Sequence, residues 1–138
     1  MNSIFFRRLF IISSALGTVG VIFGAFGAHF LKSRLAASDM DIIRTGILYL
    51  FIHVIVLLFL ILLARADAQS RLLRSAGVMF IIGIFLFSGS LFIIGTQSLT
   101  GLGGPFIGIL TPFGGFCFIT GWMMLTVYAF SNLGRINL

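Results

Sequence analysis

The sequence is poor in charged residues, and this scarcity restricts the class of protein more than any other feature. Only 9% of the 138 residues are Asp, Glu, Lys or Arg, whereas 59% are hydrophobic. Globular chains in water typically carry about 25% charged residues. One water-soluble domain of this length cannot hide so many apolar groups. We therefore expect lipid to surround the chain.

Cysteine and acidic residues are scarce as well, and this excludes several kinds of site. The single cysteine, Cys117, stands in an apolar stretch, so neither an intrachain disulfide nor a cysteine-rich metal site is possible. His29 and His53 lack a good third metal ligand, because all three carboxylates lie in predicted connections between spans. Without paired carboxylates or a nucleophile beside an evident base, we expect no catalytic residue, no metal and no cofactor.

The basic residues outnumber the acidic ones, nine to three, and give a net charge of +6. A strongly basic chain can bind nucleic acid when its cations follow one solvated face. Here the cations are isolated or paired between long apolar runs. We interpret them as signals of membrane topology, and we expect no nucleic acid partner.

Four apolar runs are long enough to cross a bilayer as helices. A bilayer core about 30 Å thick requires about 20 apolar residues of helix. The runs cover about residues 9–31, 45–64, 76–95 and 111–131. The sequence thus predicts an all-α fold, an integral membrane four-helix transmembrane bundle that forms a single domain over residues 1–138.

The start of the fourth helix has two interpretations. Thr111 followed by Pro112 is typical of an N-cap with proline in the first turn. Residues 97–110 would then form a glycine-rich outer connection. The alternative is a helix that starts near Gly108 and bends at the proline. We favour the Thr111 cap.

The second helix also carries a possible start signal ahead of its apolar run. Ser38, with Asp41 three residues later, resembles a capping box. This spacing indicates a helix that begins near Asp39 and rises out of the membrane.

The distribution of Lys and Arg indicates how the chain is oriented. Six lie on the side of the N-terminus, namely Arg7, Arg8, Arg65, Arg71, Arg74 and Arg135. Three lie on the other side, namely Lys32, Arg34 and Arg44. Because basic loops stay in the cytoplasm, we expect both termini to be cytoplasmic.

Small residues recur along the first span at alternating spacings of four and three, which places them on one helical face. They are Ser13, Gly17, Gly20, Gly24 and Gly27. The fourth span has a similar row that includes Gly115 and Trp122. Small residues let helices in lipid approach closely, so we expect both rows to contact neighbouring helices. The indole N–H of Trp122 then needs an acceptor within the bundle.

Polar residues within the spans are few, and counting along the helices places them at similar depths in the outer half of the membrane. The predicted cluster is His29, Tyr49, His53, Ser88, Ser90 and Thr111. Ionisable groups inside a membrane are candidates for function. The simpler interpretation is a set of hydrogen bonds between helices that only fixes their packing.

Five motifs in order, at fitting spacings, carry a resemblance over nearly the whole chain. They are GAFGAH (24–29), Tyr49 with His53, LFSGSL (86–91), TPFGG (111–115) and GW (121–122). The chain resembles the YgdD/YwdK-like family, domain-of-unknown-function family 423, which consists of small bacterial inner-membrane proteins with mitochondrial relatives. The resemblance implies four spans in a bacterial inner membrane, and it implies no activity.

These observations favour a non-enzymatic function. Our first hypothesis is a structural, accessory or partner-binding protein, whose glycine faces pack against another copy or a larger membrane complex. One alternative is a small transporter or channel that uses the outer polar cluster. Another is a lipid-binding or quinone-binding protein with a site in the same region.

Overall fold

The computed structural model describes residues 2–132 of the protein, and these are almost entirely helical, without a strand. In chain order the elements are α1 (Asn2–Phe26), η1 (Gly27–Leu31), α2 (Ala37–Leu63), α3 (Arg71–Gly83), η2 (Ile84–Ser88), α4 (Gly89–Gly95), α5 (Gln97–Thr100) and α6 (Pro105–Ser131). The two η elements are π-helical turns that continue α1 and join α3 to α4. Four continuous helices are long and apolar enough to cross a membrane, which confirms the predicted all-α membrane fold.

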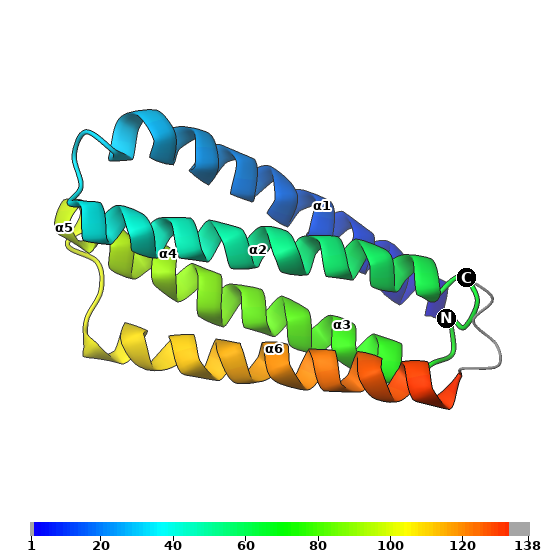
Figure 1. Ribbon diagram of the computed structural model, residues 1–138. Helices are drawn as coiled ribbons and strands as arrows, with labels where there is room; N and C mark the ends of the chain where they lie inside the picture. Colours follow the sequence, from blue (N-terminus) through cyan, green and yellow to red (C-terminus); the bar gives the residue numbers. More distant parts are fainter. Residues whose placement is uncertain (1, 133–138) are drawn as a thin grey trace.

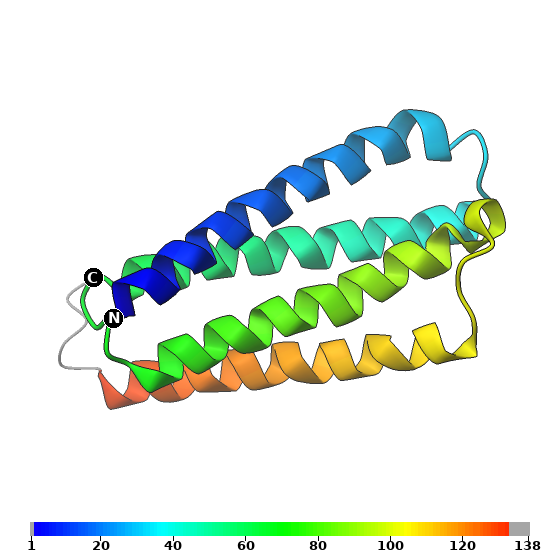
Figure 2. The ribbon, with the colours of Figure 1, turned by 180° about the vertical axis from the view of Figure 1, so that it is seen from behind.

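The four long helices run alternately up and down, with α1 and α6 at opposite edges (Figures 1 and 2). Between them lie α2 and the continuous helix α3–η2–α4. The start of α1 and the end of α6 lie at one end of the bundle, called here the terminal end (Figure 1). The short helix α5 lies at the other end, called here the α5 end. Contacts between α3 and α6 and between α1 and α2 hold the two edge helices in place.

The fourth helix starts earlier than expected, and the predicted N-cap at Thr111 is wrong. α6 begins at Pro105, and Gly104 precedes it as the N-cap residue. Gly101 and Gly103 have φ angles of 66° and 137°, which L side chains rarely adopt, so the chain turns there and enters the helix at a different proline. Pro112 lies inside α6, as in the alternative interpretation.

The predicted capping box of the second helix is also wrong. α2 begins at Ala37, and its N-cap residue Ala36 makes no side-chain cap hydrogen bond. Ser38 thus lies in the first turn, while the Asp41 carboxylate accepts a hydrogen bond from Arg44 at 2.9 Å. This ion pair replaces the expected contact.

Polar first turns also lengthen the first and third helices beyond their apolar runs. α1 begins at Asn2 rather than near Leu9, and α3 begins at Arg71 rather than near Ala76. Ser70 caps α3, because its hydroxyl oxygen accepts a hydrogen bond from the Leu73 N–H at 3.3 Å. The length of the apolar runs does not predict these first turns, because polar residues can continue a helix beyond the apolar run into the membrane interface.

His53 lies just past the middle of α2, counted from its first residue. The residue lies sixteen positions beyond Ala37, or about 24 Å along a helix whose whole length is about 40 Å. The place of His53 in the outer half of the membrane stays a prediction. Ser90 and Thr111 lie closer to the α5 end, where their hydroxyl groups meet.

Candidate functional site

His53 lies at the centre of a group of aromatic rings contributed by α2, α3, η2 and α6. Its imidazole is 3% exposed and stacks on Phe118, with ring centroids 3.5 Å apart and planes at 5°. Phe80 lies 5.5 Å from the imidazole, and Trp122 approaches edge-on at 6.4 Å. We call the whole group the aromatic cluster, which comprises Tyr49, His53, Phe80, Phe87, Phe118 and Trp122.

Two glycines provide the space that these rings occupy. A Cβ atom at Gly83 would lie 2.5 Å from the ring of Phe118, and one at Gly121 would lie 2.7 Å from the ring of Phe80. Both distances are too short for real contacts. Because Gly83 and Gly121 carry no side chains, the rings of Phe118 and Phe80 can enter the interface between α3 and α6 and reach His53.

The imidazole of His53 uses only one of its two nitrogens. Nδ1 lies 2.7 Å from the carbonyl oxygen of Tyr49. Because a carbonyl oxygen can only accept, Nδ1 carries the hydrogen and donates it, and the neutral ring leaves Nε2 as an acceptor. Nε2 has no hydrogen-bond partner in the described part of the chain, and the same is true of the fully buried Ser88 hydroxyl. Unpartnered polar atoms in an apolar interior cost free energy, so both atoms are candidates for contact with a ligand or a water molecule.

A second polar contact joins α4 to α6 nearer the α5 end. The hydroxyl groups of Ser90 and Thr111 lie 2.7 Å apart, and Ser90 also lies within hydrogen-bond distance of the Phe87 carbonyl, at 2.9 Å. Next to this contact, Gly114 of α6 lies directly against the backbone of η2 at Leu86 and Phe87. The π-helical turn therefore packs against α6 at Gly114, two residues after Pro112.

The six predicted polar residues are brought together only in part. Ser90 meets Thr111, and the rings of Tyr49 and His53 are neighbours, with centroids 6.0 Å apart. His29, in η1, is exposed instead. Ser88 is buried without a partner in the described residues. A common function for all six stays a prediction.

The glycines among the predicted packing residues divide into three groups. Gly20 is close to α2, since a Cβ atom there would lie 2.8 Å from Leu50. Gly17, Gly27 and Gly115 have ordinary spacing, with their nearest atoms at 3.8 to 3.9 Å. Gly24 has no such atom within 4 Å, so the expected close contact is absent there. Closer contacts occur at Gly83, Gly95, Gly114 and Gly121, where a Cβ atom would lie 2.4 to 2.7 Å from its nearest neighbour. The sequence did not predict them, because a row of glycines does not show which side its partner occupies.

Trp122 differs from the expectation that its indole is held within the bundle. One edge contacts Phe80, with ring centroids 5.7 Å apart, yet 46% of the residue is exposed. Trp122 lines a groove between α2 and α6 that has a volume of about 560 Å³. Both walls of this groove are almost wholly apolar.

The chain is similar to known proteins over most of its length. A family model described as "Protein of unknown function (DUF423)" matches residues 23–115. The chain belongs to the DUF423 family. The matched region includes His53, Ser88, Ser90 and Thr111, and it ends before Trp122.

Three members show how far the similarity extends. The UPF0382 membrane protein YwdK of Bacillus subtilis is 33% identical over 127 residues, which cover 91% of this chain and 99% of YwdK. UPF0382 membrane protein SH2409 of Staphylococcus haemolyticus is 33% identical over 92% of this chain and 99% of its own. UPF0382 inner membrane protein YgdD of Escherichia coli K12 is 32% identical over 89% of each chain. No solved structure matches.

Membership in DUF423 and the four apolar helices make the protein an integral membrane protein. Within the described residues, no group of three His, Cys, Asp or Glu side chains could hold a metal ion. The chemistry that remains is hydrogen bonding at His53 and Ser88 and apolar contact along the grooves.

Proposed function

We propose that the protein is a non-enzymatic interaction protein of the bacterial inner membrane, and that its first partner is a second copy of itself. The observation that carries this proposal is the apolar groove between α2 and α6. It is lined by Ile55, Val56, Phe59, Leu63, Trp122, Leu125, Thr126, Tyr128 and Ala129. The groove opens laterally, in the plane of the membrane, so a second transmembrane helix can lie in it.

A ridge of large side chains runs along α6 beside this groove. Phe116, Ile119, Met123 and Phe130 are 68%, 59%, 63% and 72% exposed. At 100° per residue these four side chains occupy the face of α6 next to Trp122 and Thr126. A ridge beside a groove on one surface is self-complementary, because a two-fold rotation places each copy's ridge in the other copy's groove.

Trp122 adds a polar reason for a partner. No described residue accepts a hydrogen bond from its indole N–H, and the ring stands within the apolar part of α6. A hydroxyl or carbonyl group on an incoming helix would satisfy this donor. Lipid chains offer no such group at this depth.

Cysteine cross-linking in native membranes tests the proposal. In a Cys117→Ala background, Met123→Cys on the ridge of one copy should form a disulfide on oxidation with Ile55→Cys in the groove of a co-expressed second copy. Ile11→Cys is the matched control, because Ile11 is 56% exposed on α1 and lies at a similar depth. Equal cross-linking at both positions, or none at Met123, would contradict the proposal.

The proposed orientation places both termini in the cytoplasm. Its support is the excess of Lys and Arg at the terminal end, where Arg7, Arg8, Arg65, Arg71 and Arg74 lie on described helices or their connections, while Arg135 lies outside the described residues. Labelling of single cysteines with a membrane-impermeant reagent measures this directly. Cysteines near Ser33 should react in intact spheroplasts, and cysteines near Gln69 should react only after lysis.

A second candidate function rests on the unpartnered Nε2 of His53 and hydroxyl of Ser88. These atoms favour a small transporter, or a protein that binds a lipid or quinone. A hydroxyl group of the guest, such as that of a reduced quinone, would donate a hydrogen bond to Nε2, and the Ser88 hydroxyl could donate to a guest carbonyl. A His53→Phe variant in proteoliposomes distinguishes the candidates. Loss of a measurable flux or of a co-purified quinone supports the second candidate, whereas retained dimerisation without either effect supports the first.

A further inference from the structure

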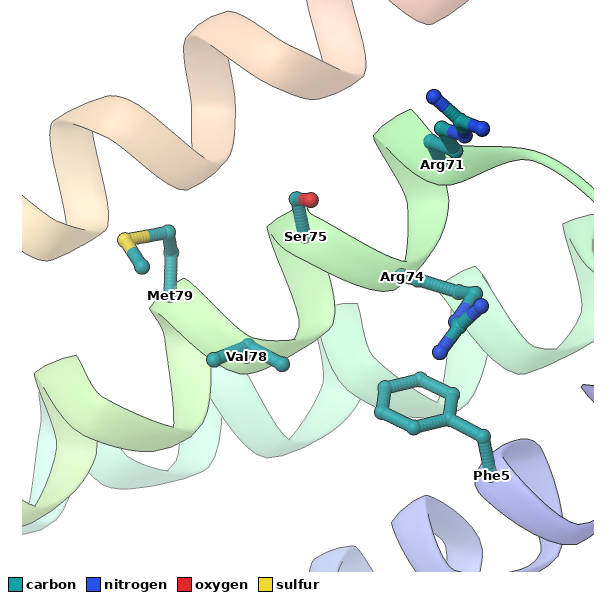
Figure 3. Close-up of a pocket in the computed structure, with 6 residues that line it drawn as sticks. All are labelled: Phe5, Arg71, Arg74, Ser75, Val78 and Met79. Atoms are coloured by element: carbon teal, nitrogen blue, oxygen red, sulfur yellow. The ribbon is translucent and has the colours of Figure 1, made fainter.

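A notch between α1 and α3 at the terminal end is built differently from the groove described above. It has a volume of about 370 Å³ and is lined by Phe5, Arg71, Arg74, Ser75, Val78 and Met79 (Figure 3). Five of these six residues follow one another along a single face of α3, at spacings of three, one, three and one. None of the described residues that line the notch is acidic.

The polarity of this face changes in one direction along the helix. Arg71 and Arg74 occupy the first turn of α3, Ser75 follows, and Val78 and Met79 lie deeper in the membrane. From Arg71 to Met79 the helix rises about 12 Å. Charge at the interface, a hydroxyl below it and apolar groups beneath match the order of groups in a phospholipid, from phosphate to glycerol ester to acyl chain.

The arginines are placed to hold an anion at the height of the lipid phosphates. The guanidinium carbon of Arg74 lies 5.3 Å from the centroid of the Phe5 ring on α1, so this contact supports its position (Figure 3). Arg71 is the first residue of a 13-residue helix, whose N-terminal N–H groups and dipole also attract negative charge. Basic pockets between transmembrane helices are a common form of site for anionic lipid head groups.

The groove near the α5 end gives a useful contrast. It is lined by Lys32 and Arg44 above apolar residues, but the Arg44 guanidinium is paired with Asp41 at 2.9 Å. A carboxylate beside the cation opposes binding of a second anion. The lining of each groove includes two cations and no acidic residue, and at the α5 end the Asp41 carboxylate, just outside the lining, already engages one of these cations.

We propose that the notch formed by Phe5, Arg71, Arg74, Ser75, Val78 and Met79 is a binding site for one anionic phospholipid of the leaflet at the terminal end. The guanidinium groups contact the phosphate, Ser75 lies level with the ester region, and Val78 and Met79 contact an acyl chain. This site lies apart from the α2–α6 groove, so it does not depend on dimer formation.

Native mass spectrometry of the full chain tests this proposal. The protein is taken from nanodiscs that contain equal amounts of phosphatidylglycerol and phosphatidylcholine, and the retained lipid is identified. We expect wild-type protein to retain one phosphatidylglycerol in preference to phosphatidylcholine. The Arg71→Gln/Arg74→Gln variant should lose this retention by about tenfold or more, because each basic residue near a membrane surface contributes substantially to anion affinity. Added inorganic phosphate should not displace the lipid.

Matched variants keep the test decisive. Lys32→Gln/Arg44→Gln removes two cations at the other end and should leave retention unchanged. Should the double glutamine variant fail to fold, Arg71→Lys/Arg74→Lys and Val78→Trp replace it. The lysine variant should keep the lipid, and the tryptophan variant should lose it because the ring fills the place of the acyl chain. Equal loss in both charge variants, equal retention of the two lipids, or displacement by inorganic phosphate would overturn the proposal.

Discussion

The two edge helices of this protein are attached to the centre of the bundle by different kinds of contact. α6 touches α3 and η2 through backbone, because Gly114 leaves no space between itself and Phe87, and through rings that fill the positions of absent side chains at Gly83 and Gly121. α1 packs mainly on α2, where Gly20 faces the side-chain ends of Leu50 and Phe51. Its contact with α4 includes the stacked rings of Phe23 and Phe92, with centroids 4.5 Å apart. Beside this pair, α1 and the α5 end form an apolar groove of about 390 Å³.

The difference shows that a row of glycines does not by itself make a tight interface. α1 has the more regular row, yet Gly24 has no atom of another helix within 4 Å of its Cβ position. The glycines of α6 form a less regular row. However, they face large side chains or the backbone of the neighbouring helix. Packing energy comes from atoms that fill the space, and glycine only makes that space available.

The largest effect should come from removing the backbone contact of α6. In Gly114→Ala the new methyl group would meet backbone atoms of η2, which cannot rotate away, so we expect a loss of about 3 kcal/mol or more in unfolding free energy. Steric trapping in bicelles measures this quantity. Gly115→Ala is the neighbouring control, since its nearest atoms are 3.9 Å away, and it should cost nothing. Equal losses in the two variants would remove the distinction on which the comparison rests.

The next largest effect should come from the aromatic cluster. His53→Ala removes a buried ring that stacks on Phe118, and the cavity should reduce the unfolding free energy by about 2 to 4 kcal/mol. His53→Phe keeps a ring of similar shape and removes the unpartnered Nε2, so its stability should equal or exceed that of the wild type. Denaturation in mixed micelles measures the unfolding free energy of both variants and of the wild type. A phenylalanine variant as unstable as the alanine variant would show that Nε2 has a partner on which folding depends.

A smaller effect is expected at the contact between α1 and α2. Gly20→Ala places a methyl group 2.8 Å from the end of Leu50 and 2.9 Å from the end of Phe51. Side-chain ends can move, so we expect a loss of about 1 kcal/mol. The unfolding experiment used for Gly114 applies, with Gly24→Ala as the control that should lose no stability. A loss at Gly20 as great as that at Gly114 would mean that both edge helices are held equally.

The smallest effect should come from the hydrogen bond between α4 and α6. A double-mutant cycle with Ser90→Ala and Thr111→Val should give a coupling energy of about 0.6 kcal/mol, which is typical of hydrogen bonds between helices in membranes. A coupling energy above about 2 kcal/mol would indicate that this polar contact, rather than glycine packing, fixes α6.

The four membrane helices could be predicted from sequence because hydrophobic length is a local property. The first residues of the helices were predicted less accurately. Pro105 and Pro112 each have a plausible place in a first turn, and the φ angles of Gly101 and Gly103 decide between them. Such backbone angles depend on the whole connection and not on the two residues that suggest a cap.

The candidate site was predictable only in its components. His53, Ser90 and Thr111 stand out as polar residues in apolar runs. Ser90 and Thr111 are 21 positions apart on two helices, so their pairing could be predicted only if the relative register of these helices were known. The main partner of His53, Phe118, is one of 17 phenylalanines and has no distinguishing local pattern. The Gly83 space that admits Phe118 is visible only when α3 and α6 are packed together.

The most direct test of the difference between the two edges is a pair of distance distributions from spin labels in lipid bilayers, in a Cys117→Ala background. One pair joins Phe85→Cys in η2 to Phe116→Cys in α6, and the other joins Val21→Cys in α1 to Ile93→Cys in α4, all at exposed positions. The account predicts a narrow distribution for the η2–α6 pair and a clearly broader one for the α1–α4 pair. Equal widths, or a narrower distribution for the α1–α4 pair, would contradict it.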